Sequence, residues 1–540
     1  MKQQLYALAV LLGAAQTQAQ TFNAYEHIDI NNFNQRVMLH GDMWWNNATS
    51  EPQCEYPKGS GKHVLFGGAI WMGGYDDQGQ LRVSSQTYRQ TGNDYWPGPL
   101  DQNGMLSMAT STDWARIWKV NKTTIDSFKA MGIHTTANTH PAILEWPAIH
   151  NPYAKGANGA LLTITTPMAP FIDKDGDGKY NPLNGDYPSI KGDQMLWWVF
   201  SDNGPTHSHS SSQSLVVEIH AAVYGYKKNT LIDNVVYYEF SIKNKSVFDY
   251  QDFRMGIWTD ADLGDFNDDF IGFDSSRRLG YIYNGATTDG NGAPGHYGTQ
   301  IPTAGIAIIK SPTDISGNKA PVGSFMYFNN DNSNLGNPTT GVHYYNYLRA
   351  QWKDGSHVTH GAVGSGGTVN ANYVFPDDPA LPTGWSECAL NHAPGDRRFV
   401  IATDDYEFKK GSTVQCIFAV VATPPATNNG CPNFTTTTIK EVADTAINQF
   451  GDPVSVQAVK TASGKLSIYP NPVSDKVSIA IPGSNKTTVV VYNAFGNEVL
   501  SAETNGNNKA ELSISHLPAG VYNIVAFDGI ERQHGKFIKQ

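Results

Sequence analysis

Residues 215–259 read LVVEIHAAVYGYKKNTLIDNVVYYEFSIKNKSVFDYQDFRMGIWT, and they carry the clearest signal of the fold. Runs rich in β-branched and aromatic residues lie at Leu215–Tyr226, Val235–Asn244 and Phe253–Thr259, with polar turns between them. Such side chains fit the pleated surface of a strand, and runs at this spacing are typical of antiparallel sheets. The segment therefore predicts consecutive β-strands.

The same signal continues along the chain. Further strand-like runs follow, at Leu279–Tyr283, Ile301–Ile309, Val322–Phe328, Phe399–Ala402 and Val414–Val421. Their spacing predicts a β-sandwich over residues 211–450, which ends in an amphipathic helix at Thr438–Phe450. Residues 20–210 mix short strands with long loops rich in Gly, Pro and Asn, and one short helix is expected at Thr123–Met131. The fold class is therefore mainly β and multi-domain, with a loop-rich N-terminal region.

Composition places the chain among globular, extracellular proteins. The 540 residues exceed one ordinary domain, 40% of them are hydrophobic, and only 16% are charged. Soluble domains typically have roughly 25% charged residues. The formal net charge of -11 argues against a nucleic-acid partner, because phosphate binding needs clustered Lys and Arg.

Residues 1–19 have the pattern of a secretory signal peptide. Lys2 precedes an apolar stretch from Leu5 to Ala15, and Thr17-Gln18-Ala19 supplies a small-residue cleavage site after Ala19. The apolar stretch falls short of the ~20 residues that a membrane-spanning helix needs, and no later segment predicts one. We therefore expect an exported protein without a transmembrane segment.

Residues 465–540 change to short alternating strands, which predicts a small immunoglobulin-like β-sandwich. A linker at residues 451–464 precedes it, because Gly451-Asp452-Pro453 stops the helix before it. Three turn motifs punctuate the segment: Tyr469-Pro470-Asn471-Pro472, Gly496-Asn497, and the run from Leu517 to Tyr522.

These motifs and their terminal position resemble the C-terminal sorting domain, type A, of substrates of the Bacteroidota type IX secretion system. The resemblance implies export across the outer membrane to the cell surface or the medium. It also implies two partners, the secretion machinery and a sortase-like peptidase that removes the domain. The body of the chain is similar to a class of large passengers of this route, through Gly41-Asp42-Met43-Trp44-Trp45 and the run from Gly92 to Pro99. That class has no established activity, so the resemblance transfers no catalytic residue.

The clearest chemical motif is Asp173-Lys174-Asp175-Gly176-Asp177-Gly178-Lys179-Tyr180-Asn181. Carboxylates at alternate positions, followed by Gly for a sharp turn, converge on a hard cation, and calcium is its natural occupant. Asn184 stands where an EF-hand needs a bidentate Glu, so Asp186 or Asp193 would complete the shell. The predicted ligand set is Asp173, Asp175, Asp177, Lys179, Asn181 and Asp186. A polar turn without metal is the alternative.

A second acidic cluster runs from Asp260 to Asp274. Its carboxylates repel one another unless a cation or hydrogen-bond donors offset their charges. We therefore predict a second calcium site, with Asp260, Asp262 and Asp265 as ligands. The alternative is the carboxylate pair of a glycoside hydrolase, one acid and one base or nucleophile. A structural role for calcium is the favoured interpretation.

The tryptophans and the His207-Ser208-His209 motif each allow two interpretations. All twelve Trp lie between Trp44 and Trp385. Exposed Trp and Tyr would stack on sugar rings, whereas core packing is the commoner fate of large aromatic residues. His207-Ser208-His209 puts two imidazoles on one side of an extended segment, where they would bind zinc. With no further ligand at a recognisable spacing, a polar loop is favoured.

The four cysteines, Cys54, Cys388, Cys416 and Cys431, allow three pairings. Export to an oxidising compartment favours disulfides, and free buried thiols are the alternative. No sequence feature picks out a Cys/His pair, so a catalytic thiol is not predicted.

Together these features predict a secreted or cell-surface, calcium-stabilised β protein that binds an extracellular ligand such as a polysaccharide or a surface component. Two alternatives stay open: a secreted glycoside hydrolase, and a structural component of a surface layer or filament. No H-E-x-x-H or G-x-S-x-G motif assigns a catalytic residue. The sequence leaves enzymatic activity open and favours a binding protein.

Overall fold

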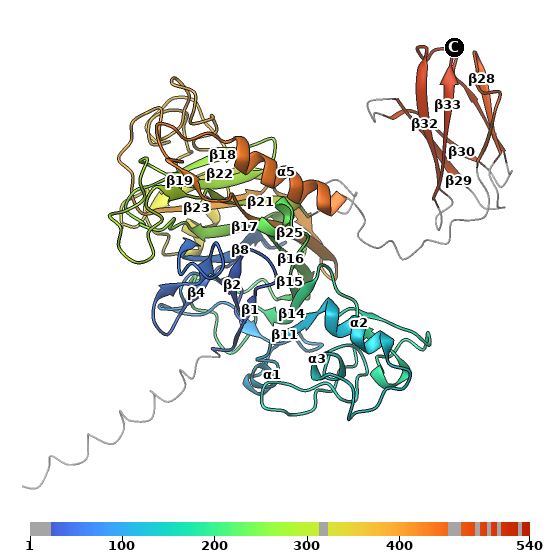
Figure 1. Cartoon of the computed structure of the whole chain (residues 1–540), viewed down its shortest axis with the longest axis horizontal. Helices are drawn as coiled ribbons and strands as arrows, with labels where there is room; N and C mark the ends of the chain where they lie inside the picture. The colour runs from blue at the N-terminus through green and yellow to red at the C-terminus, as the bar shows by residue number, and fades with distance from the viewer. Residues whose placement is uncertain are drawn as a thin grey trace, which may run out of the picture. The chain divides into compact units, whose positions relative to one another are not determined.

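The computed structural model describes residues 23–312, 322–451, 466–480, 487–493, 498–504, 509–527 and 532–540. The predicted signal peptide, and the predicted linker after residue 451, lie outside these residues. The chain divides into two compact units between Asp452 and Pro453. We call the described residues 23–451 the passenger unit and those from 466 onward the tail unit (Figure 1). None of the helices in these ranges is long and apolar enough to cross a membrane.

The first large sheet of the passenger unit has eleven strands and is antiparallel. Its order is β22-β23-β17-β8-β3-β2-β6-β7, with β1 beside β2, β9 beside β8 and β24 beside β17. The strands are β1 (Tyr25–Ile28), β2 (Asn34–Met38), β3 (Asp42–Met43), β6 (Cys54–Glu55), β7 (His63–Leu65), β8 (Gly67–Tyr75), β9 (Leu81–Ser84), β17 (Tyr250–Asp260), β22 (Val322–Asn329), β23 (Arg397–Thr403) and β24 (Tyr406–Phe408).

The second large sheet has nine strands and is also antiparallel. Its order is β10-β14-β15-β16-β25-β21-β19-β18, with β11 beside β14. The strands are β10 (Trp96–Pro97), β11 (Trp118–Asn121), β14 (Gln194–Ser201), β15 (Val217–Gly225), β16 (Val235–Asn244), β18 (Asp269–Asp274), β19 (Leu279–Asn284), β21 (Ala304–Lys310) and β25 (Thr413–Ala422). Three small pairs complete the unit: β4 (Trp45–Asn46) with β5 (Glu51–Pro52), β12 (Phe171–Ile172) with β13 (Tyr187–Pro188), and β20 (Gln300–Ile301) with β26 (Ala426–Thr427).

The second sheet is buried on both faces, because apolar residues occupy both sides of its central strands. In β14, Leu196 and Trp198 belong to a core that includes side chains of both large sheets. Met195 and Trp197, in contrast, belong to a separate core that includes residues of the passenger's helices. Successive side chains of a strand point to opposite faces, so one strand contributes to two cores. The first core makes the passenger unit a β-sandwich.

Helices are few in the described residues. They are α1 (Met108–Asp113), α2 (Lys122–Ala130), α3 (Pro141–Leu144), α4 (Gly341–Tyr347) and α5 (Thr437–Gly451), with the short 3-10 turns η1 (Pro182–Asn184) and η2 (Leu231–Asn234). Of these, α2, α3 and α5 contribute to the separate core that contains Met195 and Trp197 (the second core), whereas α4 packs against β8 and β9 of the first large sheet. The helices predicted at Thr123–Met131 and Thr438–Phe450 are confirmed as α2 and α5. In α5, Ile439, Val442 and Ala446 are buried in the second core, as expected for one apolar helical face.

The tail unit contains two small sheets around a core of its own. One sheet joins β27 (Ser467–Tyr469), β28 (Lys476–Ala480) and β31 (Lys509–Ser513). The other has the order β30-β29-β32-β33, with β29 (Thr487–Tyr492), β30 (Glu498–Thr504), β32 (Gly520–Phe527) and β33 (Arg532–Lys539). The mainly β fold predicted from the sequence is therefore confirmed in both units.

Strands from both sides of residue 210 belong to each large sheet: β8 pairs with β17, and β14 pairs with β15. The two regions predicted for the passenger thus share their sheets, and the boundary between them stays a prediction. Among the four cysteines, Cys388 and Cys431 form a disulfide. Cys54 and Cys416 are buried free thiols.

Candidate functional site

A pocket of about 410 Å³ opens on the passenger unit where five stretches of the chain meet. This volume lies within the ~300–1,000 Å³ that small-ligand sites occupy. Its lining combines aromatic rings with hydroxyl, amide and imidazole groups, supplied by Thr87, Tyr88, Gln90, Thr91, Ser208, His209, Ser211, Trp258, Phe328, Asn330, Asn337, Pro338, Thr339 and Tyr344. We call it the aromatic pocket.

The aromatic wall of this pocket is rigid. Trp258 of β17 stacks on Trp71 of β8, with ring centroids 5.9 Å apart, and Tyr344 of α4 meets the Trp71 ring edge-on at 4.7 Å. Tyr88 in turn lies edge-on to Trp258 at 5.2 Å. Offset-stacked and edge-on arrangements stabilise aromatic pairs beyond the area that they bury. The buried Trp258 indole N–H has no hydrogen-bond partner, so the wall also contains an unsatisfied donor.

His209 and Tyr344 form a hydrogen-bonded pair in the pocket. The Tyr344 hydroxyl lies 2.9 Å from Nε2 of His209, and the hydroxyls of Thr87 and Thr91 lie 3.3 Å from the two ring nitrogens. Burial lowers the pKa of His209, so the imidazole is neutral at pH 7. Burial raises the pKa of Tyr344, so its phenol stays protonated. A neutral imidazole beside a phenol can accept and return a proton.

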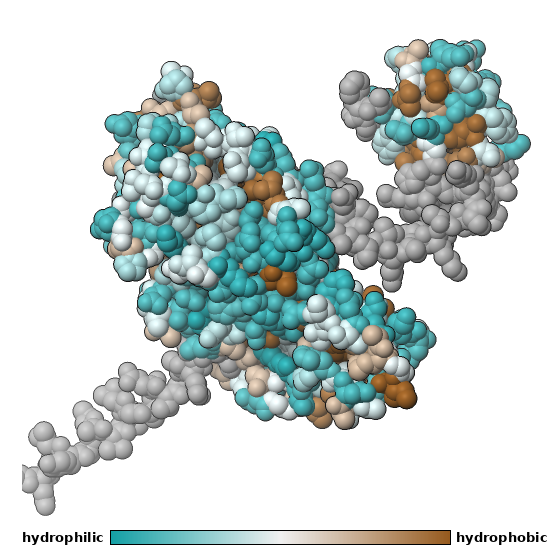
Figure 2. Space-filling view, in the orientation of Figure 1, coloured by the Kyte–Doolittle hydropathy of each residue, from teal (hydrophilic) through white to brown (hydrophobic). Residues whose placement is uncertain are grey.

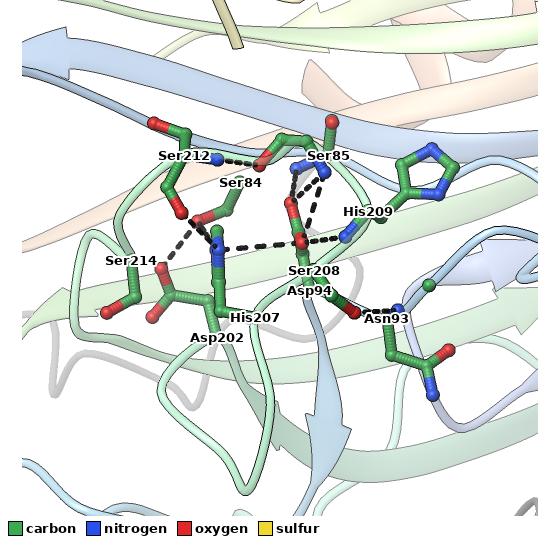
Figure 3. Close-up of polar contacts among 12 residues, drawn as sticks. Ser84, Ser85, Asn93, Asp94, Asp202, His207, Ser208, His209, Ser212 and Ser214 are labelled. Carbon is green, nitrogen blue, oxygen red and sulfur yellow. Dashed lines mark hydrogen bonds and ion pairs between the residues drawn. The ribbon is translucent and has the colours of Figure 1, made fainter. Parts of the chain in front are cut away.

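A buried carboxylate holds the His209 main chain in place (Figure 3). Asp94 accepts hydrogen bonds from the backbone N–H groups of Ser85 at 3.0 Å, His209 at 2.7 Å and Ser210 at 3.2 Å. The His209 ring points away from this carboxylate in Figure 3. Gly92 lets the loop approach so closely, since a Cβ there would lie 2.8 Å from the His209 nitrogen.

The neighbouring Ser84, His207 and Asp94 resemble a hydrolase triad in their contacts. Oγ of Ser84 lies 3.1 Å from Nε2 of His207, and Nδ1 of His207 lies 3.5 Å from Asp94 (Figure 3). Ser84 is completely buried, however, and its hydroxyl donates to Asp202 at 2.6 Å. Asp202 also accepts from the backbone N–H groups of Leu215 and Val217. The network therefore fastens the loop that carries His209, and Ser84 cannot reach a substrate.

The first predicted calcium loop folds as a compact exposed turn. The carboxylates of Asp173, Asp175 and Asp177 offer oxygens within 4.8 Å of one another. Asp173 accepts from the N–H groups of Gly176 and Gly178, both of which have a φ of +76° that favours glycine. A group of three such carboxylates fits a hard divalent cation.

The other predicted ligands of this loop have defined places. Asp186 accepts from Lys174 N–H and Asn181 N–H, both at 2.8 Å. Burial, and then the charges of Asp175 and Asp173, raise the pKa of Asp186. The Asn181 side chain caps η1, and the Lys179 N–H donates to Asp177. The alternative ligand Asp193 accepts from Lys227 N–H instead.

The fold brings together only some of the predicted ligands of the second acidic cluster. Asp260 and Asp262 lie within 4.8 Å of Asp396, which sequence reasoning missed because it lies far along the chain. Asp265 is not in this group, and its carboxylate accepts from the backbone and side chain of Asn267. Burial raises the pKa of Asp260 to about 6, against the opposing effect of Arg398.

This triad adjoins the aromatic pocket through two side chains that line it. Tyr88 donates its hydroxyl to Asp260, and Asn330 donates to Asp396 at 3.1 Å. Arg398 lies 2.6 Å from Asp396 and 3.3 Å from Asp260, so it offsets part of the negative charge. Asp260 is only 1% exposed. Asp260 therefore lies behind the pocket wall, whereas Asp262 and Asp396 are half-buried.

The tryptophans are core residues, as the second sequence alternative predicts. None of the twelve is more than 8% exposed. The visible face of the passenger unit is mostly hydrophilic, with scattered hydrophobic patches (Figure 2). Sugar-binding aromatic platforms on the open surface are thus not formed by tryptophan, and Trp258 is the only one that lines the aromatic pocket.

Comparison with known proteins identifies the tail. Residues 467–540 match the family described as "Secretion system C-terminal sorting domain". The sequence resemblance is therefore confirmed, and the chain carries a sorting domain of the type IX secretion system. This domain implies interaction with that machinery and export across the outer membrane to the cell surface or the medium.

Similarity of this chain to characterised proteins is distant. An endo-acting ulvan lyase of Formosa agariphila is 24% identical over 181 residues, which make up 32% of this chain and 32% of that enzyme. The matched stretch thus spans about a third of the relative. Among solved structures, a polysaccharide lyase has 11% identity and a TM-score of 0.18, covering 60% of this chain and 34% of that one. A biofilm-associated protein domain has 12% identity and a TM-score of 0.14, covering 57% and 60%.

Proposed function

We propose that the exported passenger unit binds an extracellular polysaccharide, and that the aromatic pocket holds one of its sugar residues. The observation that carries this proposal is the lining of the pocket, where Tyr88 and Trp258 stand beside the amides of Asn330 and Asn337 and the hydroxyl of Thr339. Sugars present both hydroxyls and apolar ring faces, so sites that hold them combine aromatic and polar side chains.

The distant relative supports the same class of ligand. It is named as a lyase of ulvan, and the type IX sorting domain delivers this chain to the compartment where extracellular polysaccharides are found. The similarity covers a third of each chain, so the particular polysaccharide is open.

Two calcium sites belong to the same proposal. The first takes Asp173, Asp175 and Asp177 as ligands, with Asp186 beneath the turn. The second takes Asp260 and Asp262 together with Asp396. Divalent calcium would offset the carboxylate charges in each group. It would also stabilise loops that have little hydrophobic core of their own. The role proposed for both sites is structural.

Removal of the tail by a sortase-like peptidase completes the proposal. We expect a mature N-terminus near Gln20 and loss of the tail after about Phe450. Mass spectrometry of the secreted protein measures both ends. An intact tail on the secreted product contradicts the processing step.

The test of polysaccharide binding uses two matched variants of the full-length protein. Gln90 is exposed and lines the pocket, whereas Gln78 is exposed and lies outside its lining. Gln90→Trp should fill the pocket and lower retention on the bound polysaccharide at least tenfold, while Gln78→Trp should leave retention unchanged. The assay measures co-sedimentation with a panel of insoluble polysaccharides, in calcium and in chelator. Equal retention of both variants contradicts the pocket as the binding site.

The glycoside hydrolase alternative is less favoured. No Asp or Glu is among the residues that line the aromatic pocket. Glycoside hydrolysis canonically requires two carboxyl groups that flank the scissile bond. Asp260, the buried candidate, is paired with Arg398 and Tyr88 behind the wall. Self-assembly of the purified protein without binding to any polysaccharide would favour the surface-layer alternative instead.

A further inference from the structure

The aromatic pocket contains one pair of groups suited to proton transfer. Tyr344 and His209 lie 2.9 Å apart and both line the cavity. Tyr344 is 3% exposed and His209 is 6% exposed, so a bound ligand would exclude most of the remaining water from them. Saccharide binding alone does not require a buried imidazole paired with a phenol.

We infer that Tyr344 and His209 are catalytic residues that cleave a 4-linked, uronic-acid-containing polysaccharide by β-elimination. The inference rests on the proposed function, because it takes the aromatic pocket as the site where a sugar binds. It adds the reaction and the class of sugar.

The chemistry of the lining favours elimination over hydrolysis. Hydrolysis of a glycosidic bond uses a pair of carboxyl groups, and the pocket lining contains none. Elimination needs a base for a carbon-bound proton, and that proton is acidic only beside a carboxylate. A uronate therefore brings, as part of the substrate, the carboxylate that the pocket lining lacks. Its charge meets no like charge in the pocket, and the amides of Gln90 and Asn337 offer N–H donors for it.

The reaction balances without a cofactor. The Tyr344 oxygen takes the proton from C5 of the uronate while its own proton moves to Nε2 of His209. The electron pair of the C5–H bond becomes the C4–C5 double bond, and the C4–O bond breaks with its pair going to the glycosidic oxygen. That oxygen takes a proton from the Tyr344 hydroxyl, and His209 returns its proton to Tyr344. The products are a 4,5-unsaturated uronate and a chain with a new hydroxyl.

Two features of the structure prepare the pair for this role. The His209 main chain is held by the Asp94 carboxylate, which accepts from its backbone N–H at 2.7 Å, and the hydroxyls of Thr87 and Thr91 lie 3.3 Å from the two ring nitrogens. The phenol is held by the edge-on contact of its ring with Trp71 at 4.7 Å. Fixed geometry of this kind removes the need to orient the reacting groups during each turnover.

The charges around His209 set the pH dependence. Asp94 and Asp42 favour its protonation, whereas burial and His207 oppose it, and the net effect lowers the pKa. Tyr344 stays neutral throughout this range because burial raises its pKa. Since the neutral imidazole is the active form, the elimination rate should fall only as the pH drops below the ordinary His value of about 6.5.

The experiment incubates the full-length protein with polygalacturonate, alginate and glucuronan, and with carboxyl-reduced samples of each. Three quantities are measured together: bound protein, new reducing ends, and the ultraviolet absorbance of the unsaturated uronate. We expect at least one polyuronate to yield reducing ends and unsaturated product in equal amounts, and its carboxyl-reduced form to yield neither.

Three variants assign the residues. Tyr344→Phe and His209→Gln should each lower the elimination rate about 100-fold or more, the usual effect of losing a general acid or base. Tyr345→Phe is the matched control, since it lies on the same helix and its hydroxyl donates to the Asp252 carbonyl outside the pocket lining. It should retain the wild-type rate. Melting temperatures of all three variants show whether each one folds.

The outcomes separate this inference from the proposed function. Binding to polyuronates without unsaturated product, or reducing ends without its absorbance, overturns the elimination and leaves polysaccharide binding intact. Elimination that survives in folded Tyr344→Phe overturns the assigned residue. If Tyr344→Phe fails to fold, His209→Gln and the wild-type pH profile decide the assignment. Lack of binding to any polysaccharide overturns both proposals.

Discussion

Replacing Asp94 should damage the loop that carries His209 more than any surface change of the same size. The carboxylate is completely buried and accepts from three backbone N–H groups, of Ser85, His209 and Ser210. Asp94→Ala leaves these donors without an acceptor in the protein interior. The expected results are a less stable passenger unit and a displaced His209.

The expected loss of stability follows from the hydrogen bonds that Asp94 accepts. A buried donor without a partner costs about 1–3 kcal/mol. The His209 and Ser85 bonds are 2.7 and 3.0 Å long, and the Ser210 bond is longer at 3.2 Å. Counting the first two fully and the third weakly, we expect Asp94→Ala to lower the free energy of unfolding by about 3–5 kcal/mol. Asp94→Asn keeps one acceptor oxygen and should cost about 1–2 kcal/mol.

Urea denaturation followed by tryptophan fluorescence measures this free energy. All twelve Trp lie between Trp44 and Trp385, so the signal reports the passenger unit and not the tail. Asp77→Ala, at an exposed position, is the control and should stay within about 0.5 kcal/mol of wild type. A loss below about 1 kcal/mol for Asp94→Ala, with an unchanged denaturant slope, would show that the three hydrogen bonds to Asp94 do not stabilise the loop.

Three further predictions concern other parts of the passenger unit. Burial opposes ionisation of Glu218, but His220 and Lys245 outweigh it and lower its pKa from 4.5 to about 2. Its charge therefore stabilises the fold above pH 4.5, and about 3 kcal/mol is lost as the pH falls toward 2; urea unfolding of Glu218→Gln should lack this pH-dependent loss. Asp173→Ala should abolish part of the rise in melting temperature that calcium causes, as differential scanning calorimetry would measure, and a rise equal to that of wild type counts against a metal at this loop. Cys388→Ser removes the disulfide to Cys431, which closes a loop across a sequence separation of 43 residues. The substitution should therefore lower the free energy of unfolding, measured in urea, by about 3–4 kcal/mol. A loss below about 1 kcal/mol would contradict a stabilising role for this disulfide.

Local patterns in the sequence predict the strands and helices because their causes are local. The run Val235–Asn244 alternates apolar residues with a strand period and forms β16. The helix at Thr438–Phe450 is equally visible, since its apolar face repeats with a helical period. The turn at Asp173 is predicted for the same reason, because its glycines and carboxylates are neighbours in sequence.

The aromatic pocket could not be predicted in this way, because its parts come from distant segments. His209 and Tyr344 are separated by 135 residues, and nothing near either residue indicates the other. Asp396 immediately precedes β23 and meets Asp260 at the end of β17, and the pairing of these two strands depends on the whole fold. The histidine motif was visible, but its division into a structural His207 and a pocket-lining His209 depends on the buried positions of Asp94 and Asp202.

The central claim is that the aromatic pocket holds a sugar residue, and a crystal structure with a bound oligosaccharide tests it most directly. The oligosaccharide should come from the polysaccharide that the full-length protein retains best. We expect a sugar ring enclosed by Tyr88, His209 and Asn337, with Tyr344 within hydrogen-bonding distance of it. An oligosaccharide bound on another face of the passenger unit, with the aromatic pocket empty, would show that this pocket is not the sugar-binding site.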